Sequence, residues 1–126
     1  MKVLVLSNGE LKIKEIENTL ENLQEIVGGY IEMPYLSKVF ADNCIDIIIN
    51  EEGKFIEGLK PEIAVIGNDG KVLDIVYGNC IFVSHDKNGE TIELNNKQIK
   101  IVMEKLAMDV VLKGAEEKFI VKGLVV

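Results

Sequence analysis

Apolar residues recur along this chain with two different spacings, and each spacing predicts a different kind of secondary structure. An apolar run at 2–6 and an alternation of apolar and charged residues at 11–16 are typical of strands, and the turn sequence between them predicts a β-hairpin. The same two patterns return later in the chain, so further short strands are expected at 30–35, 44–49, 54–56, 63–66, 72–76, 81–83 and 118–126. Pro34 has no amide hydrogen to give to a ladder, so it is expected at a strand edge or end.

Two other stretches have apolar residues three or four positions apart, which is the spacing of an amphipathic helix. The first lies at 20–27, with Asn18 as its expected N-cap and Gly28 as the left-handed residue that ends it. The second follows Asn95, which is expected to form a reciprocal capping box with Gln98, and its apolar face is expected to continue to Val110.

Two helices and six to nine short strands joined by hairpin turns predict the α+β class. The expected architecture is a mainly antiparallel sheet of short strands with both amphipathic helices packed on one face. The 126 residues, of which 48% are hydrophobic, suit a single globular domain that spans 1–126. The apolar strand at 118–126 needs a partner, either in its own sheet or in a neighbouring subunit, and we therefore expect a homo-oligomer.

The charge of the chain excludes several kinds of partner. The net charge is −7, and all 14 basic residues are lysine. Without arginine, the chain lacks the planar fork that binds phosphate or guanine through two hydrogen bonds. An acidic surface also repels polyphosphates, so direct binding of DNA or RNA is not expected. No apolar run approaches the roughly 20 residues that span a bilayer, so we expect no membrane segment and a cytoplasmic location.

No catalytic, metal or cofactor motif stands out in the sequence. Cys44 and Cys80 lie far apart with no CxxC pair, and they are expected to be reduced core residues. His85 lies in turn-like sequence and is expected to be solvent-exposed, and a dyad with Cys80 fails because residues five apart on a strand point to opposite faces. The glycine pair follows a helix, whereas glycines that cradle phosphates precede one. We therefore expect no catalytic, metal-binding or cofactor-binding residue. An enzyme, the third hypothesis, would need a buried acid or an activated cysteine, and the sequence shows no signal for either.

The glycine pair and its surroundings are the best candidate for an interaction or ligand-binding surface. Glycines allow close approach of another backbone, and tyrosines offer both apolar and polar contacts. The candidate residues are Gly28, Gly29, Tyr30, Glu32, Tyr35, Asn50 and Glu51.

The segment Val27-Gly28-Gly29-Tyr30-Ile31-Glu32 after a helix resembles the signature of a small-domain family known only as a domain of unknown function. Further similarity lies at 50–54, 58–59, 77–83 and 94–98, so the resemblance covers roughly residues 1–108. Members of that family occur in phages, plasmids and integrated mobile elements of Gram-positive bacteria. The resemblance implies an accessory role on a mobile element, and it implies no activity, cofactor or catalytic residue.

Two functional hypotheses of different classes remain. The first is a non-enzymatic interaction protein that binds and occludes a host defence or regulatory protein through its acidic surface. The second is a protein that binds or sequesters a small ligand, such as a nucleotide or metabolite, in a pocket at an oligomer interface.

Overall fold

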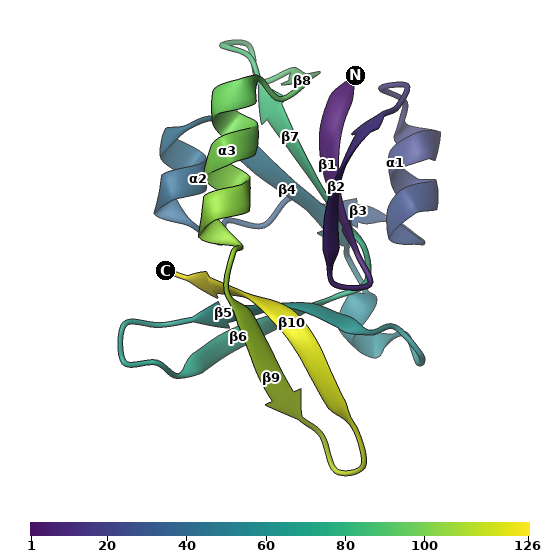
Figure 1. The fold of residues 1–126 in the computed structure, drawn as a ribbon. Coiled ribbons are helices and arrows are strands. Elements are labelled where there is room, and N and C mark those ends of the chain that lie inside the picture. The colour runs from purple at the N-terminus through teal and green to yellow at the C-terminus, as the bar shows by residue number, and fades with distance from the viewer.

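The computed structural model describes residues 1–126, which form two β-sheets and three α-helices (Figure 1). The strands are β1 (Lys2–Ser7), β2 (Glu10–Glu15), β3 (Ile31–Glu32), β4 (Ile45–Asn50), β5 (Pro61–Ile66), β6 (Val72–Tyr77), β7 (Cys80–His85), β8 (Thr91–Ile92), β9 (Asp109–Lys113) and β10 (Lys118–Val125). The helices are α1 (Leu20–Val27), α2 (Lys38–Asp42), α3 (Asn96–Lys105) and a short 3₁₀ helix, η1 (Gly53–Phe55). The predicted α+β class is confirmed.

The first sheet has the strand order β2-β1-β7-β4-β3, with β8 also paired to β7, and every pairing in it is antiparallel. The predicted hairpin is its β1–β2 edge. Asn8 and Gly9 make the turn with φ angles of 52° and 78°, as expected for a two-residue hairpin loop with two left-handed positions.

The helices lie on opposite faces of the first sheet, which corrects the expectation that both would pack on one face (Figure 1). The reason is the sequence of β1, in which all four residues at 3–6 are buried, so that both faces of the strand need a cover. Alternate residues point to alternate faces, so Val3 and Val5 pack with α1, whereas Leu4 and Leu6 pack with α2 and α3.

Capping residues fix where the helices begin and end. The N-cap of α1 is Thr19, one residue later than the predicted Asn18, and its side chain accepts a hydrogen bond from Asn22 N at 3.2 Å. Gly28 ends α1 with a φ of 84°, as predicted. The predicted capping box of α3 between Asn95 and Gln98 is confirmed, with hydrogen bonds of 2.8 and 2.9 Å.

The structure corrects two further expectations about the second half of the chain. Helix α3 ends at Lys105, so Val110 is not helical but lies in β9. Two adjacent β-branched residues, Val110 and Val111, favour a strand, and β10 supplies the partner for it. The segment at 54–56, expected to be a strand, instead contributes to η1.

The second sheet has the order β6-β5-β10-β9 and lies crosswise below the first in Figure 1. The C-terminal strand was predicted to need a partner, and it has two within its own chain: β5, which is parallel to it, and β9, which is antiparallel. Leu124, Val65 and Val76 from this sheet join the core formed by Phe82, α2 and α3. No helix of the structure is long and apolar enough to cross a membrane.

A buried carboxylate joins the two sheets. Glu62 on β5 is only 3% exposed, and its two carboxylate oxygens accept hydrogen bonds from the backbone amides of Asn8 and Gly9, both at 2.9 Å. These amides belong to the β1–β2 turn, so the carboxylate ties the edge hairpin of the first sheet to a strand of the second. Hydrogen bonds to a charged acceptor are about twice as strong as neutral ones.

Candidate functional site

The glycine pair lies where α1 passes into β3, and two asparagine side chains hold this junction. Asn50 donates to the carbonyl of Val27 at 3.1 Å, and Asn79 donates to that of Ile26 at 3.0 Å, so the last two carbonyls of the helix are satisfied. A Cβ atom on Gly29 would lie 3.0 Å from the Asn50 side-chain nitrogen. The packing of the helix end against Asn50 thus favours glycine at position 29, whereas the left-handed φ of 84° favours it at position 28.

A cleft opens beside this junction, between the two sheets, and we call it the intersheet cleft. Its volume is about 330 Å³. It is lined by Glu32, Pro34, Leu36, Ile49, Asn50, Glu51, Gly53, Lys54, Phe55, Asp74, Ile75, Val76 and Tyr77. The sequence predicted seven residues of an interaction or ligand-binding surface, and three of them, Glu32, Asn50 and Glu51, line this cleft together.

The charged groups of the intersheet cleft are predominantly acidic. Glu32, Glu51 and Asp74 contribute carboxylates, and Lys54 is the one cation of the lining. Lys54 forms an ion pair with Asp74, and this contact raises the pKa of Lys54 above its usual value. Because Asp74 neutralises Lys54, the charges left over in the cleft are those of Glu32 and Glu51.

One exposed aromatic side chain lines the intersheet cleft, and two more belong to residues that lie close to its lining residues in the chain. Tyr30 and Tyr35 are each 73% exposed and Phe55 is 88% exposed. Phe55 lines the cleft, Tyr35 follows its lining residue Pro34, and the carbonyl of Tyr30 accepts a hydrogen bond from Glu51 N at 2.9 Å. The two tyrosines were candidates from the sequence, whereas Phe55 was expected in a strand and was missed.

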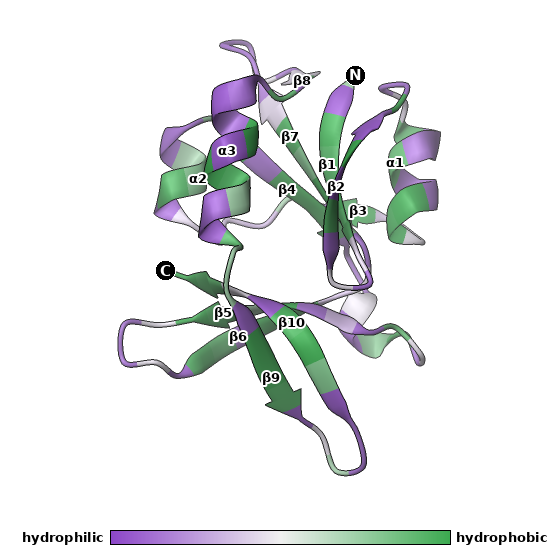
Figure 2. Cartoon of the chain, in the orientation of Figure 1, coloured by the Kyte–Doolittle hydropathy of each residue, from purple (hydrophilic) through white to green (hydrophobic).

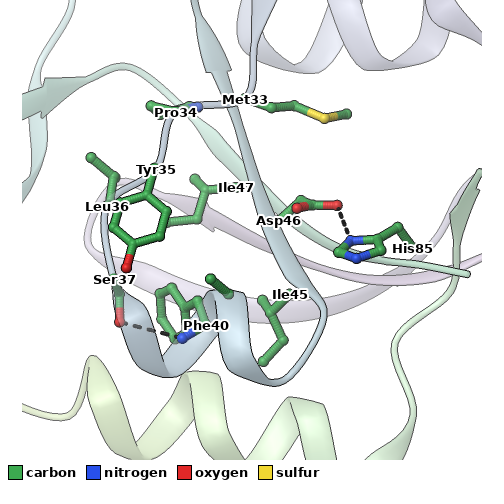
Figure 3. A pocket seen from close by; sticks show the side chains of 11 residues that line it. Met33, Pro34, Tyr35, Leu36, Ser37, Phe40, Ile45, Asp46, Ile47 and His85 are labelled. Carbon is green, nitrogen blue, oxygen red and sulfur yellow. Dashed lines mark hydrogen bonds and ion pairs between the residues drawn. The ribbon is translucent and has the colours of Figure 1, made fainter. Parts of the chain in front are cut away.

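A second cavity, of about 260 Å³, shares Pro34 and Leu36 with the cleft and lies at the open edge of β4 (Figure 3). Continuing the β3–β4 register would place Pro34 opposite Ile47. Proline cannot donate to the ladder, so β3 ends before it and the edge of β4 stays open, as Pro34 was predicted to mark an edge or end. We call this space the β4-edge cavity.

The β4-edge cavity contains the one histidine of the chain, and its placement corrects the expectation of a solvent-exposed turn residue. His85 is the last residue of β7, its side chain is 33% exposed, and its Nδ1 lies 2.8 Å from Asp46 Oδ2. Asp46 lies opposite Val83, two residues before His85, so the two side chains share one face of the sheet. Figure 3 shows this pair on one side of β4 and Tyr35, Leu36 and Phe40 on the other.

The sequence contained a signal for this pair that was overlooked. Asp46 is the one charged residue in the apolar strand β4, and a carboxylate in such a strand needs a partner. If His85 carries its proton on Nδ1, it donates to Asp46 and leaves Nε2 as an acceptor facing the cavity. The pair can therefore accept a hydrogen bond from a ligand or partner.

Two potential nucleophiles, Ser37 and Cys80, are engaged or sequestered. Ser37 is 3% exposed, and its hydroxyl caps α2 by accepting a hydrogen bond from Phe40 N at 3.4 Å. Cys80 is fully buried at the opposite end of β7 from His85, and burial, together with nearby Glu62, raises the pKa of its thiol. No group of three or more histidine, cysteine, aspartate or glutamate side chains is arranged to hold a metal ion.

The two cysteines are expected to differ sharply in reactivity. Cys44 was predicted to be a core residue but is exposed, at a φ of 57°, whereas Cys80 is buried as predicted. We expect a disulfide reagent at mildly alkaline pH to modify one thiol of the native protein quickly and the second only after denaturation, because the thiolate is the reactive form. Titration of the Cys44→Ser variant checks the assignment, and rapid modification of that native variant would contradict it.

Comparisons with known proteins give one family. No curated protein and no solved structure is significantly similar to the chain. A family described as Domain of unknown function (DUF3846) matches residues 1–107, which include the first sheet, all helices, the intersheet cleft and the β5–β6 hairpin. The match agrees with the resemblance found in the sequence, and it ends before β9. The chain therefore belongs to the DUF3846 family.

Proposed function

We propose that this protein is a non-enzymatic accessory protein that binds a protein partner through the intersheet cleft. The observation that carries the proposal is a set of three aromatic side chains that are 73–88% exposed at and beside the acidic cleft. Phe55 lines the cleft, Tyr35 lines the adjoining β4-edge cavity, and Tyr30 lies two residues before the lining residue Glu32. Aromatic side chains are the residues most enriched among those that dominate binding energy at protein interfaces.

The charge of the cleft supports a partner with basic residues. Glu32 and Glu51 are exposed, and neither has an ion-pair partner within the chain. The net charge of −7 adds a long-range attraction for a basic surface, which raises the rate of association at low ionic strength. The chain resembles a family whose members occur in mobile elements. This resemblance suggests that the partner is a host defence or regulatory protein and that binding occludes it.

Removing the three aromatic side chains tests the proposal. We expect the variant with Tyr30→Ala, Tyr35→Ala and Phe55→Ala to lose at least about tenfold in partner capture from a Gram-positive host lysate, since each such anchor typically contributes 1 kcal/mol or more. The readout is quantitative mass spectrometry of captured proteins at low ionic strength.

A matched variant controls for the loss of exposed apolar surface. Ile13, Leu20 and Met103 are 54%, 56% and 40% exposed and lie on β2, α1 and α3, away from the cleft lining. Alanine at these three positions is expected to leave capture unchanged. Equal capture by both triple variants, or capture of nothing above background by the wild type, would count against the proposal.

The second candidate is a protein that binds or sequesters a small ligand, and the volume of the intersheet cleft favours it. At about 330 Å³ the cleft lies at the lower end of the range of small-molecule sites, roughly 300–1,000 Å³. A thermal-stability screen against nucleotides and common metabolites separates this candidate from the first, because a ligand at 100 times its Kd stabilises the fold by about 2.7 kcal/mol. Flat melting curves would remove this candidate and leave the first.

A further inference from the structure

Strand β9 is an open edge of the second sheet. It pairs with β10 on one side and with nothing on the other. The hydrogen bonds from Gly114 N to Glu117 O and from Gly123 N to Met108 O show that the even-numbered residues of this segment face β10. The backbone N–H and C=O groups of Asp109, Val111 and Lys113 therefore point to the open edge.

The other sheet edges are protected against pairing with another chain. Charged residues occupy four of the six positions of β2, β3 and β8 have two residues each, and β3 stops before Pro34. Strand β6 contacts η1 and carries Asp74 in its middle. In β9, by contrast, three consecutive aliphatic residues lie between single charges, and Figure 2 shows this apolar stretch continuing onto β10. Charges and proline are the usual protection of an edge strand, and the middle of β9 has neither.

We infer that β9 pairs antiparallel with β9 of a second copy of this chain, with Val111 of one copy opposite Val111 of the other. In this register Asp109 lies opposite Lys113 of the second copy, and Lys113 lies opposite its Asp109. Asp109, Val111 and Lys113, whose backbone groups face the open edge, then each exchange backbone hydrogen bonds with one of the same three residues of the second copy. The sequence Asp-Val-Val-Leu-Lys is thus complementary to itself in charge and in hydrogen-bond direction, and the pairing joins two four-stranded sheets into one.

The side chains support the same register. Val111 and Ile120 lie opposite each other and are 55% and 67% exposed, so the dimer would place four of these aliphatic side chains in one row across the joint. On the other face, Leu112 would lie between Phe119 of its own chain and Val110 of the second copy. Both faces of the joined sheet would therefore be apolar at the two-fold axis.

Electrostatics favours the pairing in two ways. Residues 109–126 contain three acidic residues and three lysines, so this hairpin is neutral and the whole charge of −7 lies elsewhere. Within one chain, Lys113 lies opposite Lys118, which is an unfavourable pair of like charges. In the dimer, Asp109 of the second copy, which also pairs with Lys122 of its own chain at 2.9 Å, lies on the other side of Lys113 and offsets part of that repulsion. This inference does not depend on the intersheet cleft, which is lined by other elements.

Two single charge reversals provide the sharpest test. Asp109→Lys gives a strand with lysine at both ends, and Lys113→Asp gives one with aspartate at both ends, so each variant opposes like charges in its own dimer. We expect light scattering at micromolar concentration to give twice the monomer mass of 14.0 kDa for the wild type and the monomer mass for each variant alone. A mixture of the two variants restores both opposite-charge pairs, and we expect it to return to twice that mass.

Val111→Pro is a test that leaves the charges alone. The N–H of Val111 faces the open edge, so its loss removes no hydrogen bond within the chain, and proline is tolerated at such edge positions. We expect this variant to be a folded monomer by circular dichroism and light scattering, and the Val111→Thr control, which keeps the N–H and the branched side chain, to remain dimeric. A monomeric wild type, a dimeric Val111→Pro variant or a mixture of charge variants that stays monomeric would each overturn the inference.

Discussion

Replacing Glu62 with alanine is expected to lower the free energy of unfolding by about 3 kcal/mol, as measured by urea denaturation. The carboxylate accepts hydrogen bonds from the amides of Asn8 and Gly9, and bonds to a charged group contribute about 1.5–3 kcal/mol each. We take the lower part of the summed range because Asn8 is exposed, so water can replace part of the loss. The two amides lie in a left-handed turn that has no other acceptor for them in the chain.

Two further variants define the origin of this effect. Glu62→Gln keeps one acceptor oxygen but turns an NH₂ group toward a backbone N–H, so we expect about half of the loss. Glu57→Ala removes an exposed carboxylate that makes no hydrogen bond or ion pair, and it is expected to change stability by less than about 0.5 kcal/mol. If Glu62→Ala were as mild as Glu57→Ala, the clamp between the sheets would not stabilise the fold.

Replacing Gln98 with leucine is expected to lower the free energy of unfolding by about 2–3 kcal/mol. The side chain is 7% exposed and donates to Asn43 O at 2.9 Å and to Ser84 Oγ at 2.8 Å while it also accepts from Asn95 N. Leucine has a similar volume, so the loss measures the polar contacts rather than a cavity. The main cost is that the part-buried carbonyl of Asn43 is left without a hydrogen-bond donor.

The control for Gln98 lies in the same turn of α3. Lys97 is exposed and makes no side-chain hydrogen bond, so Lys97→Leu is expected to leave stability within about 0.5 kcal/mol of the wild type. Circular dichroism checks that both variants keep their helices. A Gln98→Leu variant as stable as the wild type would show that the capping box and its links to α2 and β7 contribute nothing net.

Local patterns predicted the elements that local chemistry determines. Turn residues such as Asn8 and Gly9, the cap at Gly28 and the reciprocal box of Asn95 and Gln98 involve neighbours within a few positions, and all are found in the structure. Val110 was misassigned because its spacing also fits the apolar face of α3, and only pairing with β10 decides in favour of a strand. Contacts distant in sequence also decide which helix covers which face of the first sheet. An apolar run such as 3–6 indicates that both faces of a strand are buried, but it does not indicate which elements cover them.

The candidate site was predicted in part, for the same reason. Glu32, Asn50 and Glu51 come together because β3, which directly follows the glycine pair, pairs with β4. The sequence already predicted that a strand begins directly after the turn at 28–29. Asp74 and Phe55 reach the cleft only through the second sheet and η1, whose positions depend on contacts distant in sequence. Glu62 and the Asp46–His85 pair were missed because each finds its partner across sheets or strands.

The most direct test of the proposed function is to reverse the charge of the intersheet cleft and measure partner capture. Glu32→Lys combined with Glu51→Lys changes two exposed carboxylates of the lining and leaves Lys54 and Asp74 in place. We predict that the wild type captures a basic partner at low ionic strength and loses it as salt rises, whereas the double variant fails to capture it at any salt concentration. Equal capture by both proteins across the salt series would contradict the claim that this cleft is the binding surface.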